Sequence, residues 1–256
     1  MESPISAEEI FEDILDEVFD LPFSRTTKIV DAEKKVYAAL QQYPSDICGL
    51  ITLMFIEIML GNRQKAKDLA YRIWEIGGNL PTYFEQIYLE NLLSLGLVDM
   101  ASILLKPRLE NLSANIEDFY SVFLKYAIMT GNIELLNRFK MFPTISAEDE
   151  LLYSTLGIFE ETNCLTQFKD LQKIILDNTE DILCAYEYNL YDDRGFPEIE
   201  IVIYTNHDDV SCLKMQNNLE KKIDAYWRSC GKERLYCLDV SIHNIRLHES
   251  WLGEDD

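Results

Sequence analysis

The sequence predicts a mainly α-helical fold: an α-solenoid of about five helical hairpins over residues 1–178, followed by a small α+β domain over residues 179–256. Three glycines recur at intervals of 35 residues: Gly61, Gly96 and Gly131. A small or aliphatic residue stands five places after each of them: Ala66, Ala101 and Leu136. This period is typical of stacked helical hairpins, with glycine in the turn and a small residue where the second helix packs on the first. After Asn178 the period gives way to the alternation of strands.

Residues 6–20 predict an amphipathic helix that starts at a capping box formed by Ser6 and Glu9. Leu21-Pro22 ends this helix. Its apolar stripe is Ile10, Ile14, Leu15 and Val18. Its opposite face carries acids and no base: Glu8, Glu12, Asp13, Asp16, Glu17 and Asp20. Such a face is either simply solvated or a docking surface for a basic partner.

The next predicted helix, residues 31–44, has the spacing A-x3-V-x2-A-L-x3-P, formed by Ala32, Val36, Ala39, Leu40 and Pro44. This spacing resembles the second helix of a tetratricopeptide repeat, and the resemblance extends over residues 4–178. In this register a fourth turn position falls at Thr27. The later hairpins are predicted at 47–80, 82–113, 117–144 and 146–178, the last turning at Glu161-Thr162-Asn163.

The middle repeats depart from the family pattern at three positions. Met54 stands where the first helix usually has glycine, and Arg108 and Lys140 stand where the second helix usually has a small residue. Other helical-hairpin repeats with similar geometry therefore stay open as alternatives.

The resemblance implies that a concave groove is lined by the first helix of each hairpin. The positions in this register are Cys48, Ile51, Phe55, Ile58, Tyr83, Gln86, Glu90, Leu93, Asp118, Ser121, Lys125 and Ile128. Six of them are the predicted partner-binding residues: Phe55, Tyr83, Gln86, Glu90, Ser121 and Lys125. Lys125 alone does not make the family's clamp of lysine, asparagine and arginine, so a terminal carboxylate is not the expected ligand.

The C-terminal domain is predicted to have the order β-β-α-β and resembles no family. Strands are expected at 182–191 and 198–205, joined by a turn at 192–195, with a third at 235–243. A helix over 208–229 should be capped by Asn206 and ended by Gly231. One face of the sheet should be apolar: Ile199, Ile201, Ile203, Leu238, Val240 and Ile242. The helix should bury its own stripe: Cys212, Met215, Leu219, Ile223, Tyr226 and Cys230.

No catalytic, cofactor or metal site is predicted. Adjacent residues on a helix point in different directions, so His207-Asp208-Asp209 is interpreted as a helix start. Cys237 and His243 are six residues apart on a strand, a separation of roughly 20 Å, which is too far for one tetrahedral zinc ion. Neither a nucleophile elbow nor a glycine-rich phosphate loop occurs. The six cysteines are expected to be reduced.

Acidic residues outnumber basic ones by 45 to 23, which gives a net charge of −22. Such a field repels nucleic acid and anionic membrane surfaces, and it favours a basic partner; solubility alone is the other interpretation. The N-terminus lacks the pattern of a signal peptide and no apolar run reaches transmembrane length, so a cytoplasmic location is predicted.

These features predict a non-catalytic protein–protein interaction module (an adaptor, a chaperone or a neutralising protein) that binds a basic protein or peptide. Two alternatives stay open. The chain could be an acidic decoy that mimics nucleic acid and occupies a DNA- or RNA-binding protein. It could also be an enzyme whose site lies in the C-terminal domain, where all three histidines occur.

Overall fold

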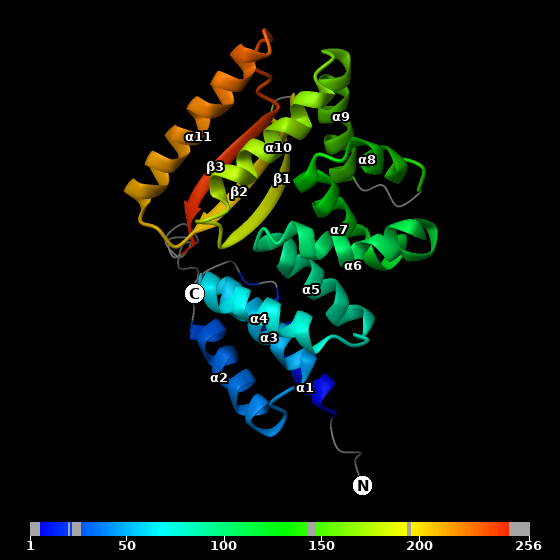
Figure 1. Cartoon of the computed structure of the whole chain (residues 1–256), viewed down its shortest axis with the longest axis vertical. Helices are drawn as coiled ribbons and strands as arrows, with labels where there is room; N and C mark the ends of the chain where they lie inside the picture. Colours follow the sequence, from blue (N-terminus) through cyan, green and yellow to red (C-terminus); the bar gives the residue numbers. More distant parts are fainter. Residues whose placement is uncertain (1–5, 20, 22–26, 143–146, 194–195, 246–256) are drawn as a thin grey trace. The chain divides into compact units, whose positions relative to one another are not determined.

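A computed structural model of the chain describes residues 6–19, 21, 27–142, 147–193 and 196–245. In these residues the chain is mainly helical, with eleven helices and a small three-stranded sheet near the C-terminus (Figure 1). The chain divides into two compact units. The first comprises residues 1–118 together with 244–256, and the second comprises residues 119–243.

The first unit contains six complete helices: α1 (Ala7–Asp16), α2 (Thr27–Gln42), α3 (Ile47–Met59), α4 (Arg63–Ile76), α5 (Thr82–Ser94) and α6 (Val98–Glu110). Helix α3 is central and contacts α1, α2, α4 and α5, which explains why it is apolar on all sides. Gly49 allows this close packing. A Cβ atom there would lie 2.5 Å from the Phe11 ring of α1 and 2.7 Å from Leu40 of α2.

The three regularly spaced glycines all lie in turns between helices, as predicted. Their φ angles are positive: 71° at Gly61, 73° at Gly96 and 60° at Gly131. In each turn the amide after the glycine donates to the carbonyl five residues back at 2.8 Å, as Asn62 does to Glu57. Asn163 repeats the turn with φ 55°, and the Cys164 amide donates to Phe159 at 2.6 Å. The residues five places after the glycines are fully buried: Ala66, Ala101 and Leu136.

The first two helices differ in extent from the prediction. Thr27 begins α2 and is not a turn residue, because Ile29 is buried and extends the apolar stripe of Ala32 and Val36 by one turn. The Ser6 and Glu9 capping box is present, with both of its bonds made. Helix α1 ends at Asp16, earlier than expected, and buries Phe11 in place of Ile10. Pro22, which was predicted to end this helix together with Leu21, lies outside the described residues.

Helix α7 (Leu112–Thr130) crosses the division between the two units. Its backbone leaves helical values at Phe119, where φ is −113° and ψ is 17°. The division at residues 118 and 119 coincides with this kink. The helix starts at Leu112 and so precedes the predicted hairpin at 117.

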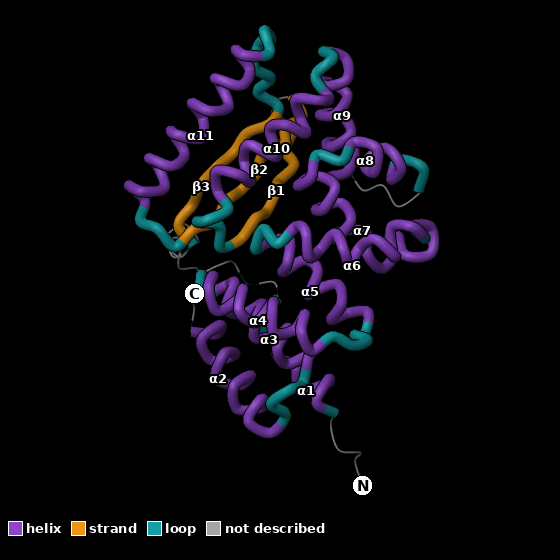
Figure 2. The backbone as a smooth tube through the Cα atoms, viewed as in Figure 1, coloured by secondary structure: helices purple, strands orange, loops and turns teal. Residues whose placement is uncertain are grey.

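The second unit combines four further helices with the sheet: α8 (Ile133–Phe139), α9 (Ala147–Glu161), α10 (Leu165–Thr179) and α11 (Asp209–Ser229). The strands β1 (Ala185–Asp193), β2 (Phe196–Thr205) and β3 (Leu238–Asn244) lie side by side with β2 in the middle (Figure 2). Strands β1 and β2 pair antiparallel, with Ala185 opposite Tyr204. The predicted apolar face is buried throughout: Ile199, Ile201, Ile203, Leu238, Val240 and Ile242.

The predicted domain boundary at 178/179 falls inside this second unit, in the last turn of α10. Helix α9 contacts both β1 and β2, and α10 contacts α9 and α11 (Asp209–Ser229). The Tyr186 hydroxyl of β1 also donates to Gln172 of α10 at 3.2 Å. The last predicted hairpin is therefore part of the layer that covers the sheet.

Helix α11 is capped by Asp208 and not by Asn206. The Asp208 side chain accepts from the Ser211 amide at 2.8 Å, and this bond lowers the pKa of the carboxyl. The predicted stripe is buried at Cys212, Leu219 and Ile223, but Trp227 is buried where Tyr226 was expected. The Tyr226 hydroxyl instead donates to Asp170 of α10 at 2.6 Å.

Candidate functional site

An aromatic pair lies at the surface of the first unit beside the acids of α1, with Phe19 exposed and Phe55 half-buried. Phe19, which follows α1, stacks on Phe55 of α3 with ring centroids 5.8 Å apart and an interplanar angle of 12°. Phe19 is 45% exposed, so this stack is not part of the core. Helices α1 and α3 run in the same direction, since Phe11 packs at Gly49 and Phe19 packs at Phe55.

Tyr83, the second residue of α5, extends this surface. Its hydroxyl donates to Asp16 Oδ1 at 3.1 Å. Burial, this hydrogen bond and the charges of Asp16 and Glu12 together raise the pKa of Tyr83 to about 12. The hydroxyl therefore keeps its proton at neutral pH. We call Glu12, Asp16, Phe19, Phe55 and Tyr83 the acidic-aromatic surface.

The remaining acids of α1 continue this negative field. Its exposed carboxylates are Glu8, Glu9, Glu12, Asp13 and Asp16, followed by Glu17. Burial and the charges of Asp46 and Glu8 raise the pKa of the Cys48 thiol, at the start of α3, to about 12. Lys35 of α2 forms an ion pair with Glu17 at 2.5 Å. The acids of α1 thus form one negative region that extends from Cys48, at the start of α3, to Tyr83, at the start of α5.

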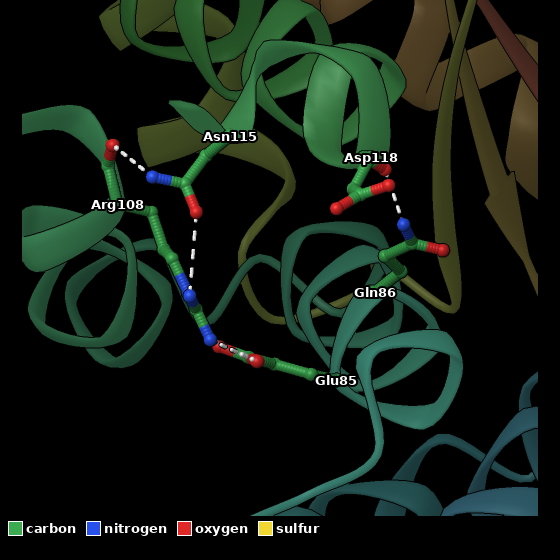
Figure 3. Close-up of polar contacts among 5 residues, drawn as sticks. All are labelled: Glu85, Gln86, Arg108, Asn115 and Asp118. Carbon is green, nitrogen blue, oxygen red and sulfur yellow. Dashed lines mark hydrogen bonds and ion pairs between the residues drawn. The ribbon is translucent and has the colours of Figure 1, made fainter. Parts of the chain in front are cut away.

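Gln86, a predicted partner-binding residue, is used within the chain. Its side-chain amide donates to the backbone carbonyl of Asp118, immediately before the kink at Phe119 (Figure 3). A kink leaves helical carbonyls without their usual amide partners, and a side-chain donor then stabilises the broken helix. Gln86 therefore holds the first part of α7 to α5.

Arg108 joins three helices through Glu85, the residue before Gln86 in α5, and Asn115 of α7 (Figure 3). Its guanidinium makes a two-pronged contact with Glu85 of α5, at 2.7 Å from Nη2 and 3.3 Å from Nε. Its Nη1 donates to Asn115 of α7 at 3.3 Å, and Asn115 donates to the Asn111 carbonyl at 2.7 Å. The chain thus has a charged clamp where the resemblance implied a small packing residue.

Replacing Arg108 with lysine should destabilise the first unit by about 1–2 kcal/mol, because an ammonium cannot contact Glu85 and Asn115 together. This range allows for the 40% exposure of the Arg108 side chain. The matched control is Arg72→Lys, because Arg72 makes a single bond to the Pro44 carbonyl. In urea unfolding, Arg108→Lys should have a lower midpoint than Arg72→Lys. Equal midpoints would show that the contacts of Arg108 contribute nothing to stability.

The other predicted positions divide between the two units. Glu90 of α5 is half-buried in the first unit, whereas Ser121 and Lys125 of α7 belong to the second. Ser121 is exposed. Lys125 is 7% exposed and forms an ion pair with Glu187 of β1 at 2.9 Å, so its ammonium is bound within the chain. Five of the remaining groove positions are buried in the core: Cys48, Ile51, Ile58, Leu93 and Ile128.

Sequence reasoning missed Phe19 as a site residue. It stands four residues after Leu15 and three after Asp16, so it lies near both the apolar stripe and the acidic face of the first helix. A large aromatic residue at the border of an acidic helical face is a usable signal for an interaction surface.

A polar cluster lies on the face of the sheet opposite the buried isoleucines. This is the C-terminal region in which the enzyme alternative would place an active site. Glu200 accepts from the Tyr191 hydroxyl at 2.8 Å and from Asn189 at 3.1 Å. Burial raises the pKa of Glu200, but hydrogen bonds, those from Asn189 and Tyr191 among them, outweigh this effect and the pKa is lowered. The His243 ring lies 6.2 Å from the Tyr204 ring, centroid to centroid.

The described residues contain no group of three or more histidine, cysteine or acidic side chains that could hold a metal ion. All six cysteines are free thiols. No helix in the described part of the chain is long and apolar enough to cross a membrane. No protein-family model, curated protein or solved structure matches this chain.

Proposed function

We propose that the chain is a cytoplasmic, non-catalytic interaction module that binds a basic protein segment through the acidic-aromatic surface of its first unit. The observation that carries this proposal is the stack of the exposed Phe19 on the half-buried Phe55, beside Asp16 and Tyr83. Exposed aromatic side chains rimmed by charge mark interaction sites more often than isolated surface residues do.

The proposed architecture is a tetratricopeptide-like stack of helical hairpins. Its support is the common turn geometry at Gly61, Gly96 and Gly131, with a buried residue five places after each. In the first unit, α1 contacts α3 and α3 contacts α5, as the first helices of successive hairpins do in a solenoid. Such folds hold a partner on the surface formed by these helices.

The chemistry of the surface selects a partner segment with both basic and apolar side chains. Carboxylates such as Glu12 and Asp16 attract lysine and arginine and speed their encounter. The ring faces of Phe19 and Phe55 provide apolar contact and can stack with a guanidinium. Because aromatic rings interrupt the acids, the surface fits a protein segment better than the regular charge stripe expected of a nucleic-acid mimic.

The direct test is fluorescence anisotropy of a labelled peptide that alternates arginine and leucine, titrated with the full chain. We expect Phe19→Ala and Asp16→Asn each to weaken binding about tenfold, and added salt to slow association. Asparagine can still accept from Tyr83, so the fold is kept.

The matched controls are Ile103→Ala and Asp99→Asn, which change an exposed apolar residue and an exposed acid on α6 of the same unit. Both should bind as the unmodified chain does. Equal weakening by all four variants would contradict the assignment of the surface, and absence of binding at low salt would contradict the proposed function. A partner whose capture is competed by DNA would favour the decoy alternative.

A further inference from the structure

The outer edge of β3 is closed by one side chain. In the described sheet, β3 has β2 on one side and no strand on the other. From α11, the Gln216 amide nitrogen donates to the Val240 carbonyl, and the Gln216 carbonyl oxygen accepts from the Ile242 amide at 2.7 Å. One primary amide thus makes both bonds that the N–H and C=O of one residue in a parallel neighbouring strand would make.

The alternation of the backbone shows which groups face outward. Backbone groups on successive residues of a strand point to opposite sides, and the Cys237 carbonyl accepts from Ile199 of β2. The odd-numbered residues therefore face β2, whereas Val240 and Ile242 direct their backbone groups to the outer edge, where Gln216 meets them. Unpaired edges of this kind are templates for pairing with another chain.

The sequence of β3 is complementary to itself. In an antiparallel pair of two copies centred on Ser241, Val240 would stand opposite Ile242 of the other copy, two apolar residues on the same face. Asp239 would stand opposite His243, a carboxylate facing an imidazole with which it can hydrogen bond. Both pairs occur twice about the two-fold axis, and cross-strand pairs of these kinds stabilise sheets.

We propose that the outer edge of β3 is a latent pairing surface for β3 of a second copy of this chain, and that Gln216 keeps it closed. When the Gln216 amide leaves, the Val240 carbonyl and the Ile242 amide become available for pairing. The register centred on Ser241 then joins two copies. This surface is separate from the acidic-aromatic surface of the first unit.

The test compares Gln216→Ala with the control Asn217→Ala, whose side chain bonds only to Leu213 within α11. Light scattering during gel filtration measures mass, and hydrogen exchange measures the Ile242 amide. We expect roughly tenfold faster exchange at Ile242 in dilute Gln216→Ala. At higher concentration its mass should approach that of two chains, while Asn217→Ala keeps the mass of the unmodified chain.

A second substitution in the Gln216→Ala background tests the register. His243 is exposed, so His243→Asp leaves the fold intact but places two carboxylates opposite each other. This double variant should return towards the mass of one chain, whereas His243→Lys should keep the dimer. Unchanged exchange at Ile242, an unchanged mass of Gln216→Ala, or a dimer that His243→Asp does not weaken would each overturn the proposal.

Discussion

Replacing Gly131 with alanine is expected to destabilise the second unit by about 3 kcal/mol or more. Gly131 has a φ of +60°, a conformation that costs an alanine about 1–2 kcal/mol. A Cβ atom at this position would also lie 2.5 Å from the Lys169 Cα of α10. Because backbone cannot move aside as a flexible side chain can, the turn and α10 must separate.

Gly231 provides the matched control for this prediction. It ends α11 in the same unit with a φ of +64°, and no atom lies within 4 Å of the position of its Cβ. Gly231→Ala should therefore cost only the conformational strain, about 1–2 kcal/mol. Urea unfolding followed by circular dichroism measures both variants. Equal losses of stability would show that the turn at Gly131 does not pack against α10.

Replacing Lys65 with methionine should destabilise the first unit by about 2 kcal/mol, because it removes the cation beside a buried carboxylate. The Glu57 side chain is fully buried in α3 and accepts from Asn62 at 2.6 Å, Tyr37 at 3.2 Å and Lys65 at 3.2 Å. The expected loss is below that of a fully buried pair, because the Lys65 side chain is 58% exposed.

A double-mutant cycle isolates this interaction. Glu57→Gln keeps the shape of the side chain and removes its charge, so Lys65→Met in that background should cost less than about 1 kcal/mol. Urea unfolding of the four proteins gives the coupling free energy. Identical losses from Lys65→Met in both backgrounds would show that the ammonium does not stabilise the Glu57 carboxylate.

The regular features of the fold could be predicted because they depend on local chemistry. The turns at Gly61, Gly96 and Gly131 need a positive φ, which glycine provides without strain, and the alternation of Ile199, Ile201 and Ile203 directly gives the buried face of β2. The end of α1 was predicted less well. Helix ends depend on which orphan backbone groups find partners, and Val18 is buried after the helix has ended.

The site was less predictable because its key contacts join residues far apart in the sequence. Tyr83 was predicted to bind a partner, but its bond to Asp16 spans 67 residues. Lys125 was assigned to the groove, yet it pairs with Glu187, 62 residues away. The spacing of residues along the sequence predicts which face of a helix a residue occupies. It does not predict which side chain, distant in the sequence, contacts that residue. Arg108 shows the same limit, since its ion pair with Glu85 replaces a packing contact.

Site-specific photo-crosslinking tests the central claim most directly. Phe19 is replaced by benzoylphenylalanine, which keeps a phenyl ring near Phe55, and the full chain is irradiated with the labelled peptide of alternating arginine and leucine. The same photoreactive residue at Ile103, which is 60% exposed on α6 of the same unit, is the control. If the peptide binds the acidic-aromatic surface, position 19 should give a crosslinked product that high salt abolishes. Position 103 should give little crosslinked product. Equal crosslinking at both positions, or crosslinking at position 103 alone, would contradict this claim.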